Sequence, residues 1–195
     1  MGKLIEGKWL NDDELREYES NQYQQANGHF QRGTAGFRNW VTADGEAGPT
    51  GTGGFKAEKG RYHLFAAINC PWAHRTLIYR NVKHLQDIVG LSLVAPLRTE
   101  QGWRFDKNQK RFRDELFDLD VIHHLYTKSD PQYTGRATVP ILWDKKLNCI
   151  VSNESAEIIR MFNSAFNDIT GDTQDFCPQG KLEEINQLND LFLTT

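Results

Sequence analysis

The sequence of 195 residues predicts an α/β fold: a four-stranded mixed sheet with helices between and after its strands. Two apolar runs of strand length, 62–68 and 91–97, are separated by a helical pattern, which predicts a βαβ unit with parallel strands. Two further apolar runs, 138–143 and 147–151, are separated by a short polar turn, which predicts an antiparallel hairpin. With one helix predicted before the hairpin and another after it, the order is β-α-β-α-β-β-α.

Residues 1–60 are expected to form an N-terminal extension and a glycine-rich arm. The segment 1–28 is polar and acid-rich, and Asn11 followed by acidic residues predicts a capped short helix. Glycine dominates from Gly28 to Gly60, so this stretch cannot build a core of its own. A phosphate-binding loop is an alternative, but these glycines lack the Lys-Ser/Thr pair and the strand-then-helix context of such loops.

Cys70 lies at the end of the first predicted strand and directly before Pro71. Proline is favoured at the first helical position, so we expect Pro71 to begin the helix and Cys70 to be its N-cap. A thiol at that place faces unpaired backbone N–H groups and the positive end of the helix dipole, and both favour the thiolate. His74 and Arg75, one turn further on, could add positive charge.

Two interpretations of Cys70 stay open: a reactive nucleophile, which we favour, and a buried structural cysteine that caps a helix. Ala73 occupies the position at which a C-x-x-C disulfide oxidoreductase has its second cysteine. Any disulfide that Cys70 forms therefore requires a separate thiol, most simply a small one.

The helix after Cys70 is predicted by apolar residues at 77, 78, 82 and 85. Pro96 suits the end or the edge of the strand that follows. A charged insertion then runs from 102 to 120 and contains Trp103. The indole of Trp103 either packs under the insertion or is exposed as an aromatic contact for a ligand, and we favour packing.

The segment 121–126 predicts a helix that ends at Ser129-Asp130-Pro131. His123 and His124 point about 100° apart on a helix, so they are poor joint metal ligands and are expected at the surface or in helix packing. The Cys and His spacings elsewhere do not resemble a closed zinc site, so no metal is expected.

Pro140 opens the predicted hairpin, where it cannot donate a hydrogen bond to a sheet. We therefore expect it at a sheet edge or in a cis bend. Ser152 or Asn153 is then predicted to cap a helix that runs to Phe162 and has acidic residues in its first turn.

Composition excludes several function classes. A formal net charge of −3 gives no electrostatic case for a nucleic-acid partner or an anionic membrane. The longest apolar runs are far shorter than the roughly 20 residues that span a bilayer, and the N-terminus lacks the apolar region of a secretory signal. Cys70, Cys149 and Cys177 are too few and too scattered for a disulfide framework, so we expect a reducing, cytoplasmic location.

Four segments carry a resemblance to a known family: 69–75 (NCPWAHR), 102–105 (GWRF), 136–144 (RATVPILWD) and 152–155 (SNES). Together they resemble the Xi-class glutathione transferases, the S-glutathionyl-hydroquinone reductases. The resemblance covers most of residues 30–165. It implies a thioredoxin-like, glutathione-binding N-terminal domain over residues 61–168, preceded by the extension and arm of residues 1–60.

The resemblance also implies a site, with Cys70 as the catalytic nucleophile and glutathione-binding residues Trp103, Arg136, Val139, Pro140, Glu154 and Ser155. The backbone of Val139, before a cis proline, would pair with the cysteinyl part of glutathione. Glu154 would bind the ammonium of the γ-glutamyl end, and the hydroxyl and backbone N–H of Ser155 its carboxylate. Trp103 and an arginine, which we take to be Arg136, would flank the glycyl end.

The implied reaction consists of two thiol exchanges that use glutathione as co-substrate. Cys70 would take glutathione from a glutathionyl-hydroquinone as a mixed disulfide, and a second glutathione would release it as oxidised glutathione. Two other functions stay open: a glutaredoxin-like deglutathionylase, and a non-catalytic glutathione-binding or interaction module. A homodimer is expected.

Family members continue into an all-helical C-terminal domain that supplies much of the hydroquinone pocket, whereas this sequence stops at Thr195. Residues 169–195 are therefore expected to be a linker and the first helix of that domain. The segment 182–192 has the pattern of an amphipathic helix without a partner for its apolar face. We expect a truncated chain whose exposed apolar surface favours self-association.

Overall fold

The computed structural model describes residues 2–22 and 36–194, so the start of the glycine-rich arm, residues 28–35, lies outside the described residues. The helices are α1 (Asp12–Gln22), α2 (Pro71–Val82), α3 (His123–Ser129), α4 (Ser155–Ser164), α5 (Asn167–Thr170) and α6 (Leu182–Thr194). The strands are β1 (Lys3–Ile5), β2 (Lys8–Leu10), β3 (Tyr62–Ala66), β4 (Gly90–Leu93), β5 (Ile141–Asp144) and β6 (Cys149–Ser152). Short 3-10 helices are η1 (Lys110–Phe112) and η2 (Gln179–Lys181).

The central sheet has the strand order β4-β3-β5-β6. β3 runs parallel to β4 and antiparallel to β5, and β5 pairs antiparallel with β6. This confirms the predicted four-stranded mixed sheet, made of a βαβ unit and a hairpin. Every residue of β3 is buried, as expected of an inner strand with both faces covered.

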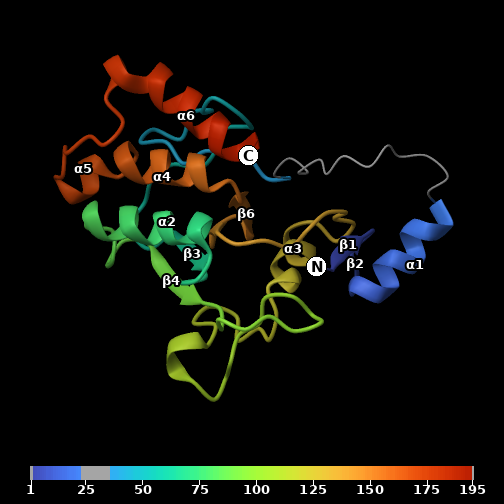
Figure 1. Cartoon of the computed structure of the whole chain (residues 1–195). Coiled ribbons are helices and arrows are strands. Elements are labelled where there is room, and N and C mark those ends of the chain that lie inside the picture. The colour runs from blue at the N-terminus through green and yellow to red at the C-terminus, as the bar shows by residue number, and fades with distance from the viewer. Residues whose placement is uncertain (1, 23–35, 195) are drawn as a thin grey trace.

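Helices cover both faces of the sheet (Figure 1). α2 and α4 lie side by side on one face, and α3 lies by β6 on the opposite side. α4 turns Ile158, Met161 and Phe162 inward, where each is at most 1% exposed. This packing places the first turns of α2 and α4 close together, and both contain predicted site residues.

The end of β4 and the start of α4 differ from the predictions. β4 ends at Leu93, so Pro96 lies outside the strand, after the edge of the sheet. The predicted cap of α4 at Ser152 or Asn153 is wrong, because Ser152 still belongs to β6 and Glu154 is the N-cap. The Val139–Pro140 bond is cis, which decides between the two expectations for Pro140.

The N-terminal extension contains a hairpin that the sequence did not predict. β1 and β2 have three residues each and are joined through Glu6 and Gly7, both at positive φ. Leu4 and Gly135 exchange two backbone hydrogen bonds of 2.9 Å, so the hairpin is tied to the loop that precedes the cis proline. The capped helix is confirmed as α1, whose Asn11 side chain accepts from the N–H groups of Asp13 and Glu14.

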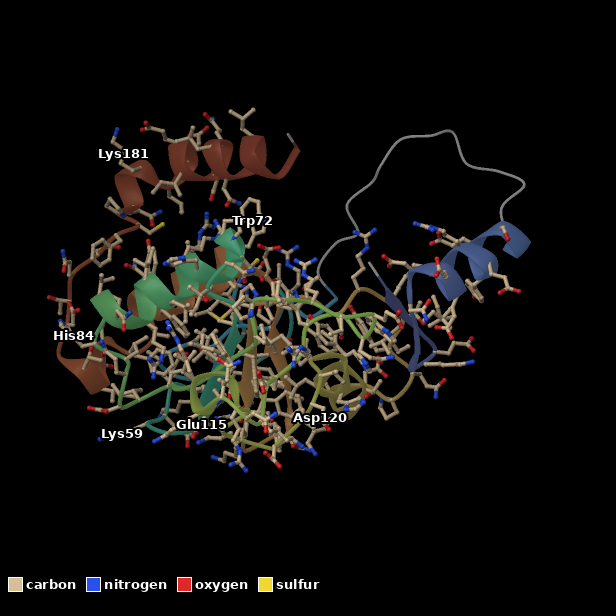
Figure 2. All side chains as sticks on the ribbon, turned by 60° about the horizontal axis from the view of Figure 1, so that its bottom comes forward. Lys59, Trp72, His84, Glu115, Asp120 and Lys181 are labelled. Atoms are coloured by element: carbon tan, nitrogen blue, oxygen red, sulfur yellow. The ribbon has the colours of Figure 1, made fainter. Side chains whose placement is uncertain are left out.

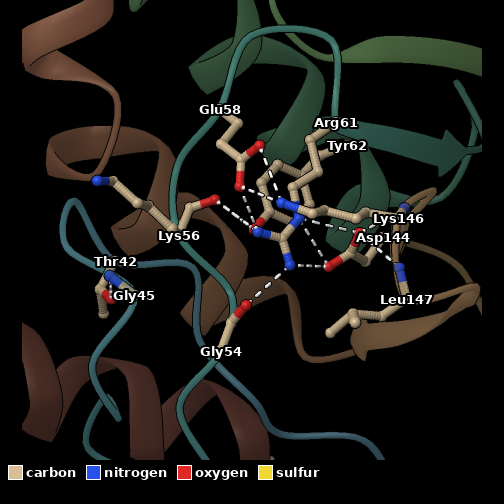
Figure 3. Close-up of polar contacts among 10 residues, drawn as sticks. All are labelled: Thr42, Gly45, Gly54, Lys56, Glu58, Arg61, Tyr62, Asp144, Lys146 and Leu147. Carbon is tan, nitrogen blue, oxygen red and sulfur yellow. Dashed lines mark hydrogen bonds and ion pairs between the residues drawn. The ribbon is translucent and has the colours of Figure 1, made fainter.

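The described part of the arm, residues 36–60, is irregular, as predicted, and is fastened to the sheet by Arg61 (Figure 3). The guanidinium of Arg61 donates to both carboxylate oxygens of Asp144, which is fully buried, and to the carbonyl oxygen of Gly54. The hydrogen bonds to Asp144 raise the pKa of Arg61. Because loss of Asp144 would leave the charge of Arg61 buried and unpaired, this pair keeps Arg61 in place, and Arg61 holds the arm through Gly54.

The charged insertion is anchored at its far end by a buried polar chain. His63 Nε2 lies 2.8 Å from Ser92 Oγ, and Ser92 Oγ donates to Asp114 over 3.1 Å. The carboxylate of Asp114 also accepts from the N–H groups of Leu116, Phe117 and Leu119. The backbone of the insertion therefore turns around the carboxylate of Asp114, which fixes its conformation there.

α6 follows the linker and lies over the side of α4 that faces away from the sheet (Figure 1). Its Asn186 accepts from Arg160 of α4, and its Asn189 accepts from Arg75 of α2. Leu188 and Leu191 are 50% and 55% exposed, in agreement with the predicted unburied face. Among residues 2–22 and 36–194, none of the helices has both the length and the apolar character needed to cross a membrane.

Candidate active site

Cys70 is the N-cap of α2, and Pro71 is its first helical residue, as predicted. Cys70 has extended backbone geometry, with φ −98° and ψ 114°, as is usual for an N-cap residue. The thiol is partly exposed, and its Sγ lies 3.9 Å from the carbonyl oxygen of Val139. The fold therefore brings together two predicted site residues that are far apart in the sequence.

The surroundings of Cys70 differ from those of Cys149. Cys149 lies at the start of β6, where burial, with a smaller contribution from the charge of Asp144, raises the pKa of its thiol. Cys70, by contrast, is the N-cap of α2 and lies at the positive end of that helix. This arrangement is typical of a reactive cysteine and argues against the structural interpretation.

The predicted γ-glutamyl end, Glu154 and Ser155, lies at the start of α4. Glu154 Oε1 accepts from the N–H of Ala156 over 3.1 Å, so the carboxylate caps the helix. Ser155 is 3% exposed, and its backbone N–H is among the first groups of a helix, which have no intrahelical acceptor. A helix N-terminus with such N–H groups suits a carboxylate ligand.

Arg75 of α2 reaches this γ-glutamyl end, whereas the sequence suggested it as a charge near Cys70. Its Nε and Nη2 donate to Ser155 Oγ over 3.0 and 2.6 Å, and Nη2 lies 3.8 Å from Glu154 Oε1. His74, the other candidate, is exposed. Sequence reasoning missed the partner of Arg75, because nothing in the sequence links residues that are 80 positions apart.

The same guanidinium joins the site to α6. Its central carbon lies 5.0 Å from the centre of the Trp72 ring, and Nη1 donates to Asn189 Oδ1 over 3.3 Å. Figure 2 shows Trp72 at the start of α2, on the side that faces α6. Arg75 therefore connects α2, to which it belongs, with α4 and α6.

The predicted glycyl end, Trp103 and Arg136, is built differently. Trp103 is 4% exposed, so the packing interpretation is confirmed, and the guanidinium of Arg98 covers its ring at 4.1 Å. Arg136 is exposed and lies three residues before Val139. The contact of Arg98 with Trp103 was missed because no sequence pattern pairs these two residues.

His123 is buried in side-chain packing, as expected. The His123 ring stacks on Trp9 with 4.5 Å between centroids, and its Nε2 lies 3.0 Å from Gln101 Oε1. Burial lowers the pKa of His123 to about 4. In the described ranges, 2–22 and 36–194, no group of three or more His, Cys, Asp or Glu side chains is arranged to hold a metal ion.

Comparison with known proteins agrees with this geometry. The sequence pattern of the family "Glutathione S-transferase, N-terminal domain" matches residues 69–165, from the residue before Cys70 to the residue after α4. The glutathionyl-hydroquinone reductase YqjG of Escherichia coli K12 is 50% identical over 190 residues, which are 97% of this chain and 56% of that protein. A Xi-class structure from Natrialba magadii superposes with a TM-score of 0.81 at 39% identity, covering 97% of this chain and 54% of the other.

The chain belongs to the Xi class of glutathione transferases. The glutathione-bound structure of YqjG is likewise similar, with a TM-score of 0.80 at 46% identity over 97% of this chain and 54% of that one. The chain spans about half the length of the curated relatives that it matches. Its thioredoxin-like fold as the N-terminal domain of a Xi-class transferase is thus established, while the boundaries at residues 60/61 and 168/169 stay predictions.

Proposed function

We propose that this Xi-class chain forms the glutathione-binding and thiol-exchange part of an S-glutathionyl-hydroquinone reductase. The observation that carries the proposal is the position of Cys70: a partly exposed N-cap thiol, 3.9 Å from the Val139 carbonyl that precedes a cis proline. Relatives from Escherichia coli and Sphingobium chlorophenolicum, at 50% and 39% identity, are named glutathionyl-hydroquinone reductases and support this choice of substrate.

Glutathione would lie extended across the carboxyl-terminal end of β3. The backbone N–H and C=O of Val139, fixed by Pro140, would pair with the cysteinyl residue as one strand pairs with another. Glu154 would accept from the γ-glutamyl ammonium, and Ser155 would donate to the γ-glutamyl carboxylate. Trp103 and Arg136 would flank the glycyl end, with Arg136 supplying a positive charge for its carboxylate.

In the first step the Cys70 thiolate attacks the sulfur of the glutathionyl-hydroquinone. The Cys70–glutathione disulfide forms, the bond between sulfur and the ring carbon breaks, and that carbon leaves with the electron pair and takes up a proton. In the second step a glutathione thiolate attacks the glutathionyl sulfur, oxidised glutathione leaves, and the Cys70 thiolate is restored. The sum consumes one glutathionyl-hydroquinone and one glutathione, and yields one hydroquinone and one oxidised glutathione.

A glutaredoxin-like deglutathionylase is the second candidate, because the same partly exposed Cys70 could attack small or protein-bound mixed disulfides without an aromatic pocket. Without a competent Cys70, a non-catalytic glutathione-binding module would remain. We also propose a homodimer in a reducing, cytoplasmic location, in which Cys149 and Cys177 stay free.

The test incubates the protein with glutathionyl-hydroquinone and glutathione and follows free hydroquinone by chromatography. Wild type should release hydroquinone with a matching amount of oxidised glutathione, and Cys70→Ala should lose turnover. Equal rates for the two proteins would refute the catalytic proposal. Turnover of glutathionylated peptides but not of glutathionyl-hydroquinone would favour the second candidate.

A further inference from the structure

The hydroxyl of Ser155 is held from one side by Arg75. Nε and Nη2 of the guanidinium both donate to Ser155 Oγ, at 3.0 and 2.6 Å. Ser155 is 3% exposed and the Arg75 side chain 24% exposed, so water competes little for this contact. A short, partly buried hydrogen bond from a charged donor is among the stronger ones that proteins make.

This contact decides what the hydroxyl can do for a ligand. A serine hydroxyl has one O–H donor and two acceptor lone pairs. Since Arg75 has no acceptor, Ser155 Oγ can only accept from it, and the O–H stays available to donate elsewhere. The adjacent backbone N–H of Ser155, at the first position of α4, is also a donor. The O–H and the backbone N–H of Ser155 can then both donate to one ligand group, and a carboxylate is a suitable acceptor.

The guanidinium itself is fixed by further contacts. Asn189 of α6 accepts from Nη1 over 3.3 Å, and the guanidinium lies 5.0 Å from the centre of the Trp72 ring. A planar guanidinium that is held on several sides keeps its direction, unlike a lysine ammonium on a flexible chain. Arg75 can therefore impose one orientation on the Ser155 hydroxyl.

We propose that Arg75 is a positioning residue that turns the Ser155 hydroxyl into a dedicated donor for the γ-glutamyl carboxylate of glutathione. The inference rests on the proposed glutathione site and deepens it: Arg75 acts through Ser155 and confers preference for thiols that have a γ-glutamyl group. It makes no contact with the reacting sulfur in this account.

The test is a double-mutant cycle on glutathione binding, measured by isothermal titration calorimetry. Arg75→Met is expected to weaken binding about tenfold or more, because the Ser155 hydroxyl loses the charged donor that orients it. In a Ser155→Ala background the same change should weaken binding by less than about threefold, since the group through which Arg75 acts is gone. Additive effects in the cycle would overturn the proposal.

A ligand comparison separates positioning from a general structural role. Cysteinylglycine lacks the γ-glutamyl group. Arg75→Met should therefore weaken its binding by less than about threefold, because the rest of the site is unchanged. Equal weakening of glutathione and cysteinylglycine would mean that the variant distorts the whole site and would contradict the proposal. Arg75→Lys provides a second variant, with binding expected between wild type and Arg75→Met, should Arg75→Met fold poorly.

The matched control is Arg160→Gln. Arg160 of α4 contacts α6 through Asn186, much as Arg75 does through Asn189, but has no hydrogen bond to Ser155. Arg160→Gln should bind glutathione as wild type does. If it weakened binding as much as Arg75→Met, lost contact with α6 would explain both results, and the proposal would be contradicted. If wild type binds no glutathione, the proposed function fails together with this inference; normal binding by Arg75→Met overturns this inference alone.

Discussion

The two ends of the proposed glutathione site are built by different physical means. At the γ-glutamyl end, Ser155 and Glu154 at the start of α4 meet Arg75 of α2 through polar contacts. At the glycyl end, Trp103 is buried under Arg98 and belongs to the hydrophobic core, while Arg136 is exposed. The first end is made of directed hydrogen bonds, and the second of packing with one solvated charge.

This difference predicts which property each end controls. Changes at the γ-glutamyl end should alter ligand binding more than folding, because Arg75, Glu154 and Ser155 meet through polar contacts and not through apolar packing. Changes to Trp103 should alter folding first, because its indole fills part of the core. A change to Arg136 should do little to either, because exposed charges are screened by solvent and salt.

The largest expected effect follows from Trp103→Ala. Removing a buried indole should lower the free energy of unfolding by about 3–5 kcal/mol, through lost burial and the cavity left behind. Urea unfolding followed by far-UV circular dichroism measures this. Trp103→Phe, which keeps most of the ring, should cost clearly less. A loss below about 1 kcal/mol for Trp103→Ala would mean that the glycyl end is not part of the core.

The next effect compares single changes at the two ends. Ser155→Ala should weaken glutathione binding about tenfold, because it removes a donor to a charged carboxylate. Arg136→Ala should weaken it by less than about threefold, because an exposed ion pair contributes little. Calorimetric titration of both variants gives the two dissociation constants. The reverse order, with the larger loss at Arg136, would contradict the comparison.

The last effect concerns pH. His123 stacks on Trp9 and follows Ile122, whose N–H donates to the carbonyl oxygen of Trp103 at the glycyl end. Burial lowers the pKa of His123 to about 4 in the folded protein, against about 6.5 in an unfolded chain. Between these values only the unfolded state binds the proton, so stability is complete above pH 6.5 and falls as the pH decreases toward 4. At pH 5 the loss due to His123 should be about 1–2 kcal/mol.

His123→Gln isolates this effect, because Gln cannot titrate but can still contact Gln101. His63, whose pKa burial also lowers to about 4, is present in both proteins and cancels in the difference. Urea unfolding at pH 7 and pH 5 should show a smaller acid loss for the variant. Identical losses in both proteins would rule out His123 as a source of acid sensitivity.

The sequence predicted those parts of the site that depend on neighbouring residues. A proline after a cysteine at the end of a strand was enough to place Cys70 at the N-cap of α2, and short apolar runs were enough to predict a mixed sheet of four strands. For Pro140 the sequence left two positions, a sheet edge or a cis bend, and the Val139–Pro140 bond is cis. The glutathione-binding roles, by contrast, came from resemblance and stay proposals.

The sequence did not predict contacts between distant segments. Arg75 and Ser155 meet only because α2 and α4 pack side by side, and this packing sets the direction of both side chains. The cap of α4 is Glu154 and not Ser152 or Asn153, because Ser152 is held in β6, opposite Leu142, and the helix begins later. The β1–β2 hairpin was not predicted, because strands of three residues are too short to show an alternation of apolar and polar residues. Its backbone is held by hydrogen bonds to residues 133–135.

The most direct measurement of the central claim is the site at which this chain takes up glutathione. After brief exposure to oxidised glutathione, intact mass and peptide mapping should show a single adduct on Cys70. Cys149 should be modified more slowly, since burial raises the pKa of its thiol. Preferential modification of Cys149 or Cys177, with Cys70 unmodified, would contradict the assignment of Cys70 as the nucleophile.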